Sequence, residues 1–453
     1  MGISRIFDIS QRSLATYQKA LDITSHNIAN ASNPDYSRQK AVLAPEKSEY
    51  NGSLVFGTGV KLDLIQRERD SLIDSQIRTN NQKYSDNSKR SDILGQVEQL
   101  FGEPSDLGLS NTMTTFFNSW SEASVNPTSS SLRFNVLRSA ENLSNKVKDI
   151  YDGLSDIKTS LMSDAKSIVS SINDYLQELQ SFNKQIFEVN LKSQQPNDLL
   201  DQRDLVIDKL SKLVNINVTT DSSNSAIVSV GGMFAVDKTI AKEFQLSESN
   251  GKLSITSGSD SFPLNVTSGE LFAVTDIYFR SIPDYVEKID SVVNTLTDSV
   301  NQLHASGFTM TSPAETGLNF FENYTDGTLT INQDILQDPN KIALSKDGTV
   351  GNGDIATKIA DLINSKLLNG TTLADNYGSL ISEIGSQKQS SDQMAQSNQL
   401  ILQQLDQQKA AVSGVSIDEE MANVIIYQRS YQASARMIKI ADEMLQTILN
   451  MVS

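Results

Sequence analysis

The chain of 453 residues contains no cysteine, two histidines and one tryptophan. Without cysteine there is no disulfide bond, no thiolate catalysis and no cysteine-bound metal. His26 and His304 alone leave almost no material for a histidine-based catalytic triad or metal site. His26 lies near the end of the first predicted helix and off its apolar line, so we expect it to be solvent-facing or interfacial. The sequence therefore predicts neither an enzyme nor a cofactor.

Long apolar runs are also missing. No stretch approaches the roughly 18 consecutive apolar residues of a membrane-spanning helix. Residues 1–10 lack the apolar core and small-residue cleavage site of a secretory signal, so any export is expected to use a route without a cleaved leader. A net charge of −17 repels nucleic acid and anionic membranes. We therefore expect no nucleic-acid partner and no membrane insertion.

The densest cluster of acidic side chains lies in one predicted helix and consists of Asp198, Asp201, Asp204 and Asp208. Their spacing places them on one helix face, which could hold a divalent cation. Acidic residues near a helix N-terminus also favour its dipole, and Arg203 lies among them. We favour this second interpretation, a solvated helix face, and predict no metal site.

Both ends of the chain carry apolar residues at every seventh position. In the N-terminal segment these are Phe7, Leu14, Leu21 and Ile28. In the C-terminal segment they are Ile417, Val424, Tyr431, Ile438 and Leu445. A seven-residue repeat is typical of a coiled-coil seam, and a helix with one apolar stripe is not stable alone. We therefore predict that the N-terminal line packs against the C-terminal line from Val424 onward.

The remaining sequence predicts a mainly α-helical fold with a small β-containing middle. Residues 215–266 have short alternating apolar runs separated by Gly, Ser, Asn and Asp, which is typical of strands and turns. A helix is expected at about 268–306. The predicted organisation is a terminal helical coiled-coil domain (1–35 and 415–453), a helical rod-like bundle (36–214 and 354–414) and a β-containing outer region (215–353).

Several segments match known motifs. Residues 25–31 read SHNIANA, residues 34–39 read PDYSRQ, residues 196–204 read PNDLLDQRD, and residues 428–438 read QRSYQASARMI. Together they resemble the bacterial flagellar axial proteins, the family of rod, hook and hook–filament junction subunits. The terminal matches rest on Asn27, Asn30, Tyr36, Arg38, Gln428, Tyr431 and Arg436. One departure is Asp35, which stands where the family usually has glycine.

The resemblance implies a structural subunit that joins hook to filament. Its paired termini would form an inner tube by head-to-tail assembly of identical subunits. It would be exported from the cytoplasm by the flagellar type III apparatus and act outside the cell. The implied partners are further copies of the chain, hook protein, the second junction protein and an export chaperone of the FlgN type on the C-terminal helix.

Two alternatives stay open. The first is another axial protein, either the second junction protein or a hook or rod subunit: the second junction protein is expected to lack the motif at 27–39, and hook protein is expected to lack the motif at 197–204. The second alternative is a secreted hydrolase or a carbohydrate-binding adhesin, which would need an inserted catalytic or lectin-like domain that the short middle region does not offer.

Overall fold

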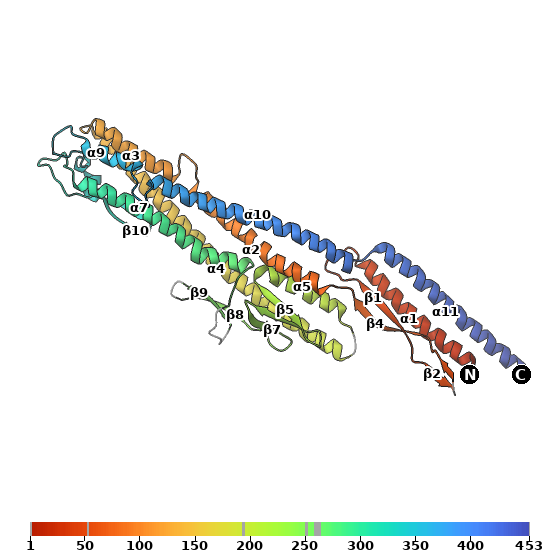
Figure 1. The fold of residues 1–453 in the computed structure, drawn as a ribbon. Coiled ribbons are helices and arrows are strands. Elements are labelled where there is room, and N and C mark those ends of the chain that lie inside the picture. Colours follow the sequence, from red (N-terminus) through yellow and green to blue (C-terminus); the bar gives the residue numbers. More distant parts are fainter. Residues whose placement is uncertain (1, 52–53, 193–194, 250–251, 258–263, 453) are drawn as a thin grey trace.

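The molecule is a long rod that continues into a narrower arm (Figure 1). The computed structural model describes residues 2–51, 54–192, 195–249, 252–257 and 264–452. We call residues 2–67 and 417–452 the arm and residues 71–413 the rod. Both ends of the chain lie together at the free end of the arm. Among the described helices, none combines the length and apolar character that crossing a membrane requires.

Helices form most of the rod. Its long helices are α2 (Ser71–Phe101), α3 (Leu109–Val125), α4 (Ser130–Leu191), α5 (Asn197–Leu213), α7 (Ile282–Ala305) and α10 (Leu373–Ser413). Shorter helices are α6 (Glu270–Asp276), α8 (Gln333–Gln337) and α9 (Asp354–Ala360). The arm contains α1 (Gly2–Ala29) and α11 (Ile417–Val452).

The rod also contains small antiparallel sheets. The first has the order β5 (Ile216–Thr220), β6 (Ala226–Val230) and β7 (Met233–Val236). Two further pairs are β8 (Phe244–Ser249) with β9 (Lys252–Ser257), and β10 (Phe321–Thr325) with β11 (Thr328–Ile331). In the three-stranded sheet Ile216 is paired with Val230 and Val218 with Val228. The β6 residues of these pairs are buried, which attaches the sheet to the helices.

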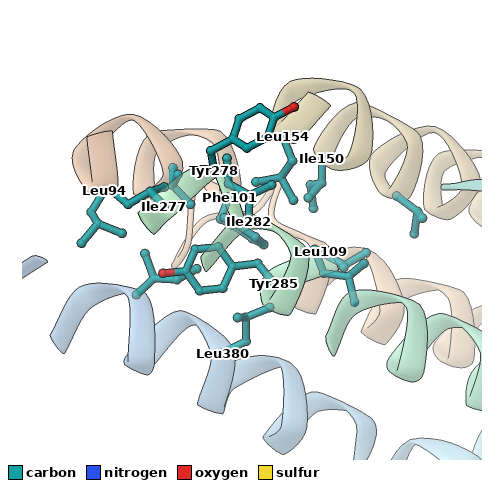
Figure 2. Packing of buried hydrophobic residues seen from close by; sticks show 14 of the residues in the cluster. Leu94, Phe101, Leu109, Ile150, Leu154, Ile277, Tyr278, Ile282, Tyr285 and Leu380 are labelled. Carbon is teal, nitrogen blue, oxygen red and sulfur yellow. The ribbon is translucent and has the colours of Figure 1, made fainter. Parts of the chain in front are cut away.

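The hydrophobic core runs through the rod. Figure 2 shows its centre, where Leu94 and Phe101 of α2, Ile150 and Leu154 of α4, and Tyr285 of α7 converge. The Tyr285 hydroxyl donates to Gln387 Oε1 at 2.7 Å, which satisfies its polar end inside the packing. The main cluster of buried apolar residues extends from Ile93 to Ile384 and includes no described residue of the arm.

The predicted fold class is confirmed. The chain is mainly helical, its two terminal helices are long, and the strands β5 to β9 lie in the segment where alternation predicted them. The helix expected at about 268–306 is present but contains a π-helical turn at Ile277–Ser281. Pro283 lacks the N–H that would bond the carbonyl of Phe279, which explains the wider turn just before it.

One segment differs from expectation. Residues 36–67 are expected in the helical bundle, but this segment contains the strands β1 (Gln39–Pro45), β2 (Glu49–Asn51), β3 (Leu54–Phe56) and β4 (Val60–Arg67). β1 pairs with β4 and β2 with β3, both antiparallel. The residues of β4 alternate, with Val60, Leu62 and Leu64 separated by charged residues. This period of two favours a strand over a helix.

His304 lies fully buried near the far end of the rod, beside Trp120 and Phe320. Its Nε2 accepts the Ala343 backbone N–H at 2.9 Å, and its Nδ1 lies 2.6 Å from the Leu318 carbonyl oxygen. These partners require a neutral imidazole with its proton on Nδ1. Burial, together with the positive charge of Arg133, lowers the pKa of His304 to about 4.

We predict that this histidine makes the rod sensitive to mild acid. In the unfolded chain His304 binds a proton below about pH 6.5, whereas in the folded chain it resists protonation down to about pH 4. The free energy of unfolding should therefore fall by about 3 kcal/mol at most as the pH drops from 6.5 to 4. Urea unfolding across this range measures it, and His304→Gln should flatten the slope.

The matched control is His26→Gln, because His26 is exposed. An unchanged pH dependence in His304→Gln, or an equal change in both variants, would contradict the assignment.

Candidate assembly site at the terminal helices

The two terminal helices pack along each other, so the predicted pairing of the chain ends is confirmed. The most buried positions of α1 are Ser10, Thr16, Ala20, Ile23, Thr24 and Asn27. Those of α11 are Glu420, Ser434 and Ala441. Many of these side chains are small, which allows two helix backbones to approach closely. The rings of Tyr17 and Tyr427 pack across the pair with their centroids 6.3 Å apart.

The apolar lines predicted from the seven-residue repeat lie beside these positions. Leu14, Leu21 and Ile28 of α1 and Val424, Tyr431 and Ile438 of α11 are half-buried. Three further predicted residues are exposed, namely Phe7, Ile417 and Leu445. The match of individual residues between the two lines stays a prediction.

α1 also packs against the first strands, so it lies between them and α11 (Figure 1). Thr16 Oγ1 donates to the carbonyl oxygen of Val60 in β4 at 3.1 Å. Gly59 has a φ of +109°, and a Cβ there would lie 3.5 Å from the side chain of Ile9. The arm is therefore layered, with strands on one side of α1 and α11 on the other.

Asn27 is the centre of a polar junction at the base of the arm. Its Nδ2 donates to the Gln39 carbonyl oxygen at 2.7 Å and to Glu420 Oε2 at 3.1 Å. Its Oδ1 accepts from the Gln39 N–H at 3.0 Å and from the Tyr36 hydroxyl at 2.7 Å. All four hydrogen-bonding positions of the amide are therefore occupied. An aspartate or a leucine of similar size could not make this set.

Glu420 joins α11 to this junction and is only 2% exposed. Its carboxylate accepts from Arg38 Nε and Nη2, each at 2.8 Å, while Arg38 Nη1 donates to Glu419 at 2.7 Å. Burial opposes the charge of Arg38, but the hydrogen bonds and charges of Glu419 and Glu420 outweigh it and raise the pKa of Arg38. The first turn of α11 is thereby fixed to the segment that follows α1.

Asp201 of α5 connects the arm to the rod. Its carboxylate accepts from the Ser37 N–H at 3.0 Å, the Ser37 hydroxyl at 2.7 Å and Arg67 Nη1 at 3.0 Å. Burial raises the pKa of Asp201, while Ser37 and the neighbouring arginines oppose that shift. Nearby, Gln39 Nε2 donates to Asp198 Oδ1 at 2.9 Å. Segments near residues 37, 67 and 201 therefore meet at one place.

Asp204 is surrounded by guanidinium groups. Arg67, Arg69 and Arg203 contact its carboxylate at 2.9, 3.1 and 3.0 Å. Burial would raise the pKa of Asp204, but these cations hold it well below its usual range. Beside it, Arg78 Nε donates to Asp208 at 2.7 Å.

The predicted solvated acidic face is thus wrong for Asp201 and Asp204, which are buried in ion pairs with arginines distant in sequence. Arg67, Arg69 and Arg78 were not predicted from the sequence as the partners of these carboxylates. The available signal was that a helix face with so many acids needs cations if it is buried. In the described part of the chain no group of three or more acidic or histidine side chains is arranged to hold a metal.

The remaining motif residues have mixed environments. Asn30 Nδ2 donates to the His26 carbonyl oxygen at 3.0 Å, close to the end of α1. His26 is exposed, and its Nδ1 lies 3.1 Å from the Tyr36 hydroxyl, which confirms the expectation of a solvent-facing or interfacial histidine. Gln428 and Arg436 are exposed on α11, away from the described hydrogen bonds of the junction.

α11 carries an unusual amount of exposed apolar surface. The large apolar side chains that it leaves exposed are Ile417, Met421, Ile425, Ile426, Met437, Ile440, Met444, Leu445, Ile448, Leu449 and Met451. A soluble chain rarely exposes so much apolar surface on one element unless a partner covers it.

A family model described as "Flagellar hook-associated protein FlgK helical domain" matches residues 94–321, half of the chain. The chain belongs to the FlgK family. A second model, described as "Flagellar basal body rod FlgEFG protein C-terminal", matches residues 407–451. This membership makes the chain a structural component of the flagellar hook–filament junction.

Similar proteins span the whole chain. Flagellar hook-associated protein 1 of Bacillus subtilis is 29% identical over an alignment of 494 residues. The alignment covers 98% of this chain and 97% of the relative. That of Salmonella typhimurium is 23% identical and covers 99% of this chain and 100% of the relative. The solved flagellar hook junction protein FlgK of Burkholderia pseudomallei has a similar fold, with a TM-score of 0.64 at 16% identity, over 75% of this chain and 100% of that one.

The charge network yields a stability prediction. Asp204→Asn should lower the free energy of unfolding by about 3–5 kcal/mol, because it leaves several buried guanidinium groups without their shared carboxylate. Asp198→Asn should change it by less than about 1 kcal/mol, because Asp198 is exposed. Urea midpoints of the two purified variants at pH 7 measure the difference. Equal midpoints would show that the network does not stabilise the fold.

Proposed function

We propose that copies of this chain assemble head to tail through their arms, outside the cell, into a ring or tube that joins hook to filament. The main support for the proposal is the exposed apolar surface of α11. In the described chain α11 packs on α1 along one side, and its other apolar side chains stay exposed. In the assembly, neighbouring copies would cover the rest. The role is structural and requires neither catalysis nor a cofactor.

The arm and the rod would take different places in the assembly. The terminal helices, which correspond to the domain of residues 1–35 and 415–453, would line the inner tube. The rod (71–413), with its helical bundle and the β-containing region (215–353), would lie farther out. Within the arm we propose as contact residues both seven-residue lines, Phe7 to Ile28 and Ile417 to Leu445.

The axial-motif residues would serve this assembly by position. Asn27, Tyr36 and Arg38 hold the start of α11 at a fixed place beside α1. A fixed start sets the register of both helices, and with it which side chains face a neighbouring copy. Asn30, Gln428, Tyr431 and Arg436 would complete this surface.

Export and partners belong to the same proposal. Before assembly the apolar surface of α11 favours unwanted association, so a cytoplasmic chaperone of the FlgN type would cover it. The type III apparatus would then export the chain to its neighbours, hook protein and the second junction protein. The match of residues 94–321 to the FlgK helical domain decides against the alternative of another axial protein, although the C-terminal segment also matches a rod-protein model.

We predict that Ile438→Asp abolishes attachment to hooks. Ile438 is half-buried on α11, so a carboxylate there would have to be desolvated in the helix pair. The rod should still fold, because its core includes no described residue of the arm. Electron microscopy of isolated hooks incubated with purified chain measures attachment. Phe134→Asp, at an exposed apolar site on the rod, is the matched control and should attach normally.

We also predict that removing residues 417–453 eliminates capture by the export chaperone in a pull-down. The deleted segment contains the exposed apolar surface that needs cover. Phe134→Ser, which changes an exposed apolar residue of the rod, should bind like the unmodified chain. Chaperone bound to the shortened chain would place the site elsewhere.

A further inference from the structure

The hairpin of β2 and β3 exposes an apolar surface that nothing in the described chain covers. Tyr50 and Val55 are 81% and 59% exposed. Tyr50 and Val55 are directly paired across the two strands, so their side chains share one face. Phe56 lies on the other face, and the Arg5 guanidinium of α1 sits 4.3 Å from the centre of its ring. The hairpin is thus anchored on α1 by one face while its other face is free.

A second apolar surface lies on α11 near its C-terminal end. Met437, Ile440, Met444, Ile448 and Met451 follow one another at intervals of three or four residues, so they form one stripe. Their exposed fractions range from 42% to 80%. Ile448 continues the seven-residue line of the buried positions Ser434 and Ala441, but it is 49% exposed, and the other members of the stripe lie beside that line.

These two surfaces lie on different sides of the arm. α1 packs on α11 and on β1 and β4, while the strands and α11 do not pack closely on each other in the described structure. Figure 1 shows β2 and α11 on opposite sides of α1, at the end where both chain termini lie. The hairpin surface and the α11 stripe therefore cannot cover each other within one molecule.

We propose that the Tyr50–Val55 face of one copy docks on the Met437–Met451 stripe of the next copy. This inference rests on the proposed function, because it assumes that arms of identical chains lie side by side. An exposed two-stranded hairpin is marginally stable alone and gains stability by packing on a helix. Methionine side chains adapt to the shape of an aromatic partner such as tyrosine.

The contact explains why assembly continues rather than stopping at pairs. It joins two unlike surfaces on opposite sides of one arm, so each bound copy presents a free hairpin or a free stripe to another copy. A contact between two identical surfaces would close as a symmetric dimer instead. The second copy is therefore the occupant that fits both surfaces and the arrangement of the arm.

Cysteine cross-linking tests this contact directly, because the chain has no cysteine of its own. The full chain carrying Val55→Cys and Ile448→Cys is assembled on isolated hooks and mildly oxidised. Non-reducing gels should show a ladder of dimers, trimers and larger species. Either single variant should stay monomeric. A third control, Phe134→Cys with Ile448→Cys, places one thiol on an exposed part of the rod and should give no ladder.

The outcomes separate this inference from the proposed function. Junctions present on hooks, seen by immunogold labelling, but without a ladder would overturn the docking contact and leave head-to-tail assembly intact. Dimers from either single variant would overturn it too, because they indicate a contact between identical surfaces. No chain on the hooks at all would overturn the proposed function. A second variant, Tyr50→Ser with Val55→Ser, should lose retention on hooks with an unchanged melting temperature, whereas Leu107→Ser, exposed on the rod, should keep it.

Discussion

The arm depends on hydrogen bonds where most domains depend on a hydrophobic core. Asn27, Arg38 and Glu420 bring the end of α1, the strand that follows it and the start of α11 to one point. Such contacts are directional and contribute modest net stability when complete, but leaving one buried partner unpaired costs more than the bond contributes. The junction therefore tolerates few alternative arrangements of its segments. It specifies where α1 ends and where α11 starts, and from there the two helices run antiparallel to the free end of the arm.

Rod and arm differ in what holds them together. The rod buries large apolar side chains such as Trp120, Phe116 and Tyr377 along its whole length. The arm buries mainly small residues of two helices, and it is joined to α5 through Asp201 and its partners. A part with few buried apolar contacts lies at the low end of local stability. The rod can therefore stay folded on its own, while in the proposed assembly the arm would gain stability from neighbouring copies.

Most of the fold was predictable because its signals are local. The seven-residue repeats and the alternation at Ile216–Val218 depend on neighbours only a few positions away. The partners of Asp201 and Asp204 could not be predicted from the sequence, because Arg67 lies 134 residues from Asp201 and 137 residues from Asp204. The seven-residue repeats also did not predict which positions of α1 and α11 are most buried. Apolar lines identify a stripe, but the most buried positions of α1 and α11 include Ala20, Ser434 and Ala441, where small size matters more than hydrophobicity. β1 to β4 were missed because Gln39–Arg67 lies between two strong helical patterns.

The charge of the chain adds a constraint on assembly. A net charge of −17 makes identical chains repel each other in solution, and this repulsion is screened by salt beyond about 8–10 Å. The proposed arm contacts are apolar and short-ranged, so they would contribute only when two arms already lie side by side. In the proposed assembly an existing hook end would provide that alignment for an incoming copy, whereas free copies meet in random orientations. Long-range repulsion combined with short-range apolar attraction would therefore favour growth on a template over association in solution. The same chain would then stay dispersed before it reaches the hook and bind firmly once it is there.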